Sequence, residues 1–134
     1  MRKDLILRGA SGELRIPVRF DETQHVEEFF SKMAHVVKME RLLKEKQTSA
    51  AAQLYGASIE MLYQFVFGAD MARAIEAFFG DDMFRMITAV NPFILGHVLP
   101  AVRAASTRNM RRKRKTFTKD QKKAMLEAFR AHTV

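Results

Sequence analysis

The chain has 134 residues, of which 48% are hydrophobic, and it contains no cysteine. This length fits one domain of common size, and the apolar content supports a real core, which excludes wholesale disorder. The lack of cysteine excludes disulfides, thiolate metal sites and thiol catalysis. Met1–Asp4 leads into only three apolar residues, too few for the core of a signal peptide. We therefore expect a soluble, cytoplasmic protein.

The excess positive charge lies entirely at the C-terminal end. Residues 1–105 hold 13 basic and 13 acidic side chains, whereas residues 106–134 hold 10 basic and 2 acidic ones. The net charge of +8 therefore belongs to the last 29 residues, and the rest of the chain is balanced. We predict two parts, a hairpin plus helical domain over residues 1–105 and a basic tail over residues 106–134.

The N-terminal segment is typical of a β-hairpin. Apolar and polar residues alternate from Leu14 to Phe20, Leu5 and Leu7 form a shorter version, and residues 9–12 supply a turn. Pro17 has no N–H group, so the second strand should have a free edge. A two-stranded hairpin alone is marginally stable, so its apolar face should pack on helices or on another copy of the protein.

Helical spacing dominates the rest of residues 1–105. Asp21 resembles an N-cap with Gln24 completing a capping box, and the helix that follows should run to about Lys46. Thr48 or Ser49 should cap a second helix through Phe67. Further helices are expected from Asp70 to the break at Gly80, from an Asp81 cap onward, and from Asn91-Pro92, with a kink or restart at Pro100. The predicted fold is mainly α: a short N-terminal hairpin, a bundle of about five helices and a basic C-terminal tail.

The apolar pattern fails over residues 106–115, which include the basic run Arg111–Lys115. This pattern predicts a linker, after which Thr118 caps a short last helix. The stretch from Ala89 to Ala105 is the most apolar part of the late sequence. It is too short to span a bilayer, and its prolines, His97 and Arg103 make it too polar. We expect no membrane partner.

Signals for catalysis or metal binding are weak. The four histidines, His25, His35, His97 and His132, include no pair with the i, i+4 spacing of a helical metal site. Asp81-Asp82 follows Gly80 and is better explained as a helix cap than as a catalytic carboxylate pair. The sequence also contains no glycine-rich phosphate loop and no nucleophile elbow. We therefore predict a protein that is not an enzyme and that uses no cofactor and no metal.

Apolar side chains provide the candidate partner-binding residues. The chain holds nine methionines and eleven phenylalanines. Most of them are explained as core, but thioethers also suit a plastic groove for a partner helix. Adjacent aromatic residues point about 100° apart on a helix, so both rings of such a pair do not fit one thin core. The candidate residues for binding a partner or a second copy are Phe29, Phe30, Phe78, Phe79, Met83 and Phe84.

The basic run admits two interpretations. Arg111, Arg112, Lys113, Arg114 and Lys115 could bind phosphates or an acidic partner, or they could only keep a flexible extension soluble. Residues 111–129 also resemble the arm and first helix of a homeodomain, with Phe117, Gln121, Met125 and Phe129 at matching positions. Lys122 departs from that pattern, and five residues after Phe129 leave no room for a base-reading helix. The resemblance to a homeodomain therefore does not support sequence-specific DNA recognition.

A broader resemblance covers residues 1–105. The order of elements, together with Phe67-Gly68-Ala69-Asp70 and a second break at Phe79-Gly80-Asp81, resembles phage tail assembly chaperones of the siphophage type. Membership would imply a non-enzymatic, oligomer-prone protein that binds the helical tape-measure protein and keeps it soluble during tail assembly. It would place the protein in the host cytoplasm, and it brings no catalytic residues.

The leading hypothesis is therefore a helix-binding protein of the tail assembly chaperone type, with the hairpin available for self-association. The first alternative is a small nucleic-acid-associated protein that grips phosphates through Arg111–Lys115. The second alternative is a structural virion or connector subunit, for which the same fold signals would be expected.

Overall fold

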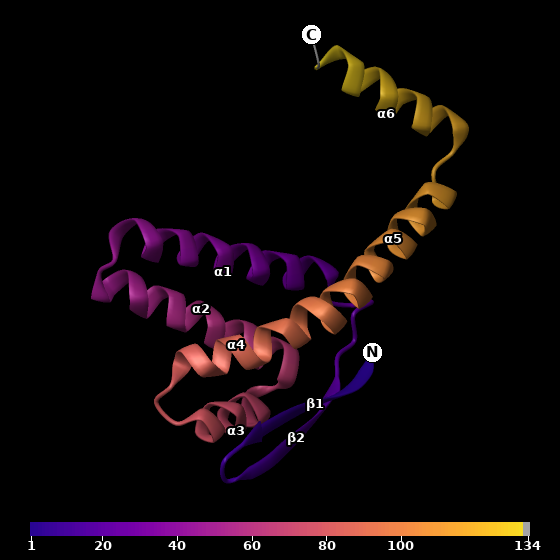
Figure 1. The fold of residues 1–134 in the computed structure, drawn as a ribbon. Coiled ribbons are helices and arrows are strands. Elements are labelled where there is room, and N and C mark those ends of the chain that lie inside the picture. Colours follow the sequence, from indigo (N-terminus) through magenta and orange to yellow (C-terminus); the bar gives the residue numbers. More distant parts are fainter. Residues whose placement is uncertain (133–134) are drawn as a thin grey trace.

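The computed structural model of the chain describes residues 1–132, apart from the side chains of residues 113–116. It confirms the predicted fold class, because an antiparallel hairpin precedes a helical body (Figure 1). The elements are β1 (Arg2–Gly9), β2 (Gly12–Arg19), α1 (Val26–Lys46), α2 (Ser49–Phe67), α3 (Ala69–Phe79), α4 (Met83–Phe93), the π-helical segment η1 (Ile94–Val98), α5 (Leu99–Thr116) and α6 (Lys119–Ala131).

The predicted hairpin forms, with Leu5 opposite Ile16 and Leu7 opposite Leu14. Gly12 has a φ of +132°, a conformation that favours glycine and that lets the two-residue turn close. One face of the hairpin is buried against the helices and includes Leu5, Leu7, Ile16 and Val18. The other face is charged, with a 3.1 Å ion pair from Arg15 to Asp4. The alternation therefore specifies which face meets the body.

Helices α1 and α2 lie side by side as an antiparallel pair (Figure 1). The predicted end of α1 at Lys46 is confirmed, and Gln47 follows it in the left-handed region. Thr48 caps α2 by accepting a 3.1 Å hydrogen bond from the Ala51 N–H. The predicted capping box at Asp21 is wrong, because that carboxylate instead accepts hydrogen bonds from the Thr23 N–H and hydroxyl. The first helix therefore begins at Val26.

The caps of the next two helices also differ from the prediction by one or two residues. Gly68 precedes α3, and Asp70 lies in its first turn instead of capping it. Asp82, not Asp81, caps α4 by accepting a 3.0 Å hydrogen bond from the Arg85 N–H. Gly80, with a φ of +61°, ends α3 as predicted.

A helix was predicted to begin at Asn91-Pro92, and this prediction is wrong. Pro92 lies inside α4, and α4, η1 and α5 follow one another without a loop (Figure 1). Asn91 is not available as a cap because its side-chain oxygen accepts a hydrogen bond from the Tyr63 hydroxyl. The π-helical segment ends two residues before Pro100, which has no N–H group, and the Leu99 N–H bonds to the Ile94 carbonyl. The perturbation expected at Pro100 is thus a widened turn.

The linker predicted over residues 106–115 is wrong as secondary structure, because α5 continues to Thr116. Val102 and Ala105 in the first half of α5 are fully buried, and α5 contacts α1. Arginine, lysine and methionine favour helix, so the helix continues beyond its buried half. Only residues 117 and 118 separate α5 from α6, and the predicted Thr118 cap is confirmed. The division of the chain into two parts at residue 105 stays a prediction.

Candidate functional site

The six apolar residues predicted to bind a partner do not form one surface. Phe29 is fully buried and belongs to the core, so its predicted partner role is wrong for this state of the molecule. Its neighbour Phe30 is 36% exposed. Phe78 and Phe79 are partly buried, and their rings lie edge to face with the ring centroids 5.2 Å apart. Phe78 also packs against the hairpin turn, since a side chain added at Gly9 would meet its ring at 3.1 Å.

Met83 and Phe84 lie at the start of α4 and are 36% and 80% exposed. Met83 lines a cavity of about 360 Å³ between α2, α3 and α4. We call this cavity the groove. Its apolar lining consists of Gly56, Ile59, Tyr63, Ala72, Met83 and Met86, and its polar lining consists of Glu60, Gln64, Arg73, Glu76 and Asp81, with Gly80 at the turn.

Gly56 leaves α2 without a side chain at the point that faces Met83. A Cβ atom added there would lie 3.5 Å from Met83 Cε and 3.7 Å from Met83 Sδ, which is ordinary van der Waals contact. Any larger side chain at this position would project into the space that Met83 borders. Glycine within a helical run often marks a close approach or a packing requirement, and here it lets the Met83 side chain lie close to α2.

The turn between α3 and α4 places the other wall. Gly80 adopts a positive φ, Asp82 caps α4, and Asp81 and Met83 are thereby held over α2. The floor is fixed by the Tyr63 hydroxyl, which donates a 2.6 Å hydrogen bond to Asn91 Oδ1. Burial raises the pKa of the Tyr63 phenol, so the donor stays protonated at neutral pH.

The groove has an acidic environment. Residues 49–93, which form α2, α3 and α4 with their turns, contain five acidic and two basic side chains. Glu60 is the one charged residue on α2, and it accepts a hydrogen bond from Gln64. Arg73 lies 4.0 Å from Asp70. The groove therefore combines flexible thioether and aromatic walls with a rim of net negative charge.

The C-terminal arm, which we define as residues 106–132, has the opposite charge. Arg111 and Arg112 are exposed on α5, while the side chains of Lys113, Arg114 and Lys115 lie outside the described residues. Helix α6 contacts no other helix or strand within the described part of the chain. Its apolar residues Met125, Leu126 and Phe129 are 57%, 47% and 67% exposed. The arm thus displays both basic and apolar side chains.

Sequence reasoning missed most of the groove. Gly56, Glu60, Tyr63 and Glu76 were not singled out, and of the six predicted apolar residues only Met83 lines it. The available signal was Gly56 in an otherwise good helical pattern. Within the described residues, no cluster of three or more histidine, aspartate or glutamate side chains could hold a metal ion.

The continuous helix from Met83 to Arg112 is long and apolar enough to cross a membrane by length and composition alone. The stretch Ala89–Ala105, which the sequence marks as too short and too polar to span a bilayer, lies within this longer helix. One third of the most apolar window is buried inside the protein, including Val90, Ile94 and Val98. A core helix of a water-soluble domain meets the same criterion.

Comparison with known protein families, curated proteins and solved structures found no match to this chain.

Proposed function

We propose that the protein is a non-enzymatic binding protein of the phage tail assembly chaperone type, acting in the host cytoplasm, and that its groove receives apolar side chains of a helical partner such as a tape-measure protein. The observation that carries this proposal is the groove between α2, α3 and α4. Its volume of about 360 Å³ falls at the lower end of the range for ligand pockets.

The groove lining suits side chains of a helix. Methionine has three rotatable side-chain bonds and a polarizable sulfur, so Met83 and Met86 adapt to partners of varied shape. Amphipathic helices dock into apolar grooves through anchors spaced by three or four residues.

The proposal is tested by affinity capture from a nuclease-treated lysate of phage-producing cells. The full-length wild type is compared with Gly56→Leu, which fills the groove, and with Glu60→Lys/Glu76→Lys, which reverses charge at two exposed rim positions. The expected result is that a long, largely helical protein copurifies with the wild type and is lost with both variants. Coexpression of that protein with the wild type should then raise its soluble yield.

The matched control is Arg111→Ala/Arg112→Ala, which leaves the groove intact and should capture the same protein. Circular dichroism and urea unfolding check that every variant is folded. Capture of the helical protein by the groove variants as well as by the wild type would contradict the proposal.

A second candidate function is phosphate binding by the arm in a small nucleic-acid-associated protein. The observation favouring it is that Arg111 and Arg112 are exposed on a helix that extends away from the body (Figure 1). Binding that rests on phosphate contacts weakens steeply with salt. If a parallel capture without nuclease retains nucleic acid and no helical protein, and Arg111→Ala/Arg112→Ala abolishes that capture, this second function replaces the first.

A further inference from the structure

We infer that the groove of one copy is occupied by helix α6 of a second copy, so that the protein self-associates head to tail. The inference rests on the proposed role of the groove as a helix-binding site and names the first helix that it binds. Three observations carry it: the apolar stripe on α6, the opposite charges of α6 and the groove, and the distance between them within one copy.

Helix α6 carries the pattern that such a groove requires. Met125, Leu126 and Phe129 follow the i, i+1, i+4 spacing of one apolar stripe, and none of the α6 residues is buried. Thr118 and Gln121 form a complete capping box, with hydrogen bonds of 3.1 Å and 2.9 Å. The helix is therefore built to form at a defined residue although it packs on no other described element.

The charges on α6 are arranged to meet an acidic rim. At about 100° per residue, all four basic residues of α6 fall within roughly 60° of Leu126: Lys119, Lys122, Lys123 and Arg130. Lys122 lies in line with the apolar stripe, one turn before it. Asp120 and Glu127 fall on the far side of the helix by the same geometry. Glu60, Glu76 and Asp81 on the groove rim outnumber the one basic residue there, Arg73. The basic side chains of α6 and the acidic rim of the groove are therefore of complementary charge.

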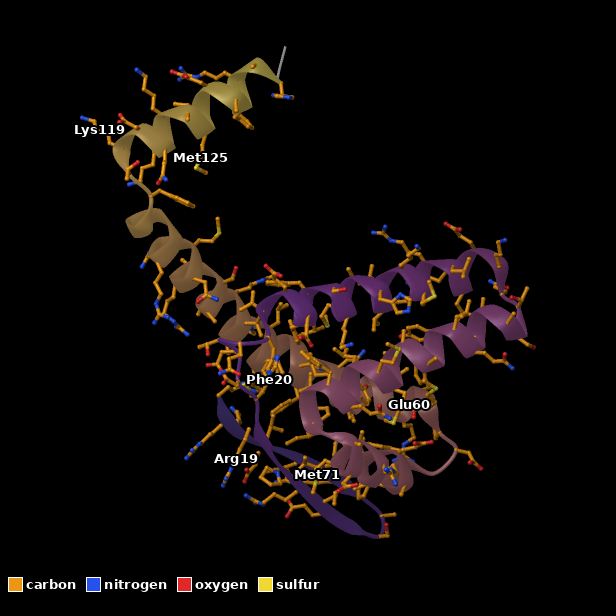
Figure 2. All side chains as sticks on the ribbon, turned by 180° about the vertical axis from the view of Figure 1, so that it is seen from behind. Arg19, Phe20, Glu60, Met71, Lys119 and Met125 are labelled. Carbon is orange, nitrogen blue, oxygen red and sulfur yellow. The ribbon has the colours of Figure 1, made fainter. Side chains whose placement is uncertain are left out.

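A single copy cannot dock its own α6 in this way. Met83 lines the groove and is the first residue of the continuous run α4–η1–α5, whose last residue is Thr116. At about 1.5 Å per residue this run separates its two ends by roughly 50 Å. Helix α6 is about 20 Å long, and a two-residue connection adds at most about 7 Å. Figure 2 shows Glu60 on the groove rim and Lys119 and Met125 on α6 at opposite sides of the molecule.

Each copy therefore offers one α6 and one groove, which are different surfaces. Such heterologous contacts form open chains, or rings where the rotation closes. The contact is small, so we expect a weak, concentration-dependent assembly that also weakens with salt. A helical partner that binds the groove would compete with α6 for it.

The test uses two full-length variants with complementary defects. Gly56→Leu keeps α6 but fills the groove, and Met125→Ser/Leu126→Ser keeps the groove but removes the apolar stripe. Analytical ultracentrifugation should show a mass that rises with concentration for the wild type, and at least a tenfold weaker association, on the order of 1.4 kcal/mol, for each variant alone. A mixture of the two variants should restore a 1:1 complex that grows no further.

Met110→Ser is the matched control, since Met110 is 70% exposed on α5 outside the stripe, and it should associate like the wild type. Should Gly56→Leu unfold, Glu60→Lys/Glu76→Lys replaces it as the groove-defective copy. The inference is overturned if the wild type stays monomeric, if Gly56→Leu alone still associates (as pairing of two α6 helices or of hairpin edges would produce), or if the mixture forms no complex.

The outcome is distinguishable from that of the proposed function. If the wild type is monomeric but Gly56→Leu no longer captures the helical partner, the inference is wrong and the proposed function is still supported. Self-association that depends on the groove, together with partner capture that does not, would do the reverse.

Discussion

The Tyr63 hydroxyl donates a 2.6 Å hydrogen bond to the side-chain oxygen of Asn91, 28 residues later in the chain. This bond joins α2 to α4 at the floor of the groove, and it explains why Asn91 lies inside a helix. It also makes the groove rigid on one side, whereas Met83 and Met86 leave the other side adaptable. The bond is therefore a natural target for testing how the groove is held.

Replacing either partner of this bond should destabilise the protein. We expect Tyr63→Phe to lower the free energy of unfolding by about 1 kcal/mol, and Asn91→Ala by about 1–3 kcal/mol, because the second change leaves a buried phenol without its acceptor. Urea unfolding of both variants and of the double variant gives the coupling energy. Tyr55→Phe is the control, since the Tyr55 hydroxyl makes no hydrogen bond among the described residues. Additive effects would show that the two side chains do not interact.

Alkaline pH should reveal the buried state of Tyr63. Burial raises the pKa of its phenol above the ordinary value near 10, so between these pKa values the folded protein holds a proton that the unfolded chain has lost. The stabilising contribution is thus complete below about pH 10 and is lost as the pH rises further, by up to about 1.4 kcal/mol per pH unit.

The chain has two tyrosines and no tryptophan, so tyrosinate absorbance can be followed directly. In Tyr55→Phe, where Tyr63 is the remaining tyrosine, we expect tyrosinate to appear together with unfolding measured by circular dichroism. The fall in stability above pH 10 should be smaller in Tyr63→Phe than in the wild type. Ionisation of Tyr63 near pH 10 in the folded protein would contradict its burial.

The sequence predicted elements well where a local signal is decisive. Alternation from Leu14 to Phe20 predicted the hairpin, and Thr48 and Gly68 bounded α2 correctly. Caps failed where a side chain has another partner: the Asp21 carboxylate bonds to Thr23. Pro92 was misread as a helix start because Asn91 is used by Tyr63, a contact that sequence spacing does not reveal.

The groove was less predictable than the helices that form it. It depends on the angle at which α3 and α4 return over α2, which the turn at Gly80 and packing determine together. Paired aromatics indicated extra surface, but Phe29 went to the core and Phe78 to the hairpin turn. The charge of the arm and the short helix after Thr118 were predicted, but residues 106–115 were expected to form a linker, because α5 continues beyond the end of its apolar pattern.

Two glycines should respond to alanine in opposite ways. Gly56→Ala should raise the free energy of unfolding by about 0.5–1 kcal/mol, because Gly56 lies in a helix and the added methyl group meets only ordinary contact. Gly68→Ala should lower it by about 1 kcal/mol or more, because Gly68 has a φ of +87° that alanine rarely adopts. Urea unfolding measures both. Destabilisation by Gly56→Ala would mean that the groove is closed there.

Core and surface phenylalanines should differ sharply. Phe29 is fully buried, so Phe29→Ala should lower the free energy of unfolding by about 3–5 kcal/mol. Phe84 is 80% exposed, so Phe84→Ala should change it by less than about 0.5 kcal/mol. Thermal and urea unfolding make this comparison. A large loss of stability with Phe84→Ala would show that this ring is packed in the core.

The caps of α2 and α6 are chemically alike but should contribute differently to stability. Thr48 and Thr118 each accept a 3.1 Å hydrogen bond from the N–H three residues later. Helix α2 is packed in the body, so Thr48→Ala should lower the global free energy of unfolding by about 1 kcal/mol.

Helix α6 has 13 residues and no packing on other described elements, and isolated helices of this length are marginal in water. Thr118→Ala should therefore speed amide hydrogen exchange within residues 119–131 and leave the global unfolding transition unchanged. These measurements are made at low protein concentration, where association through α6 is weakest. A shift of the global transition with Thr118→Ala would show that α6 is part of the folded body, which would argue against its docking in the groove of a second copy.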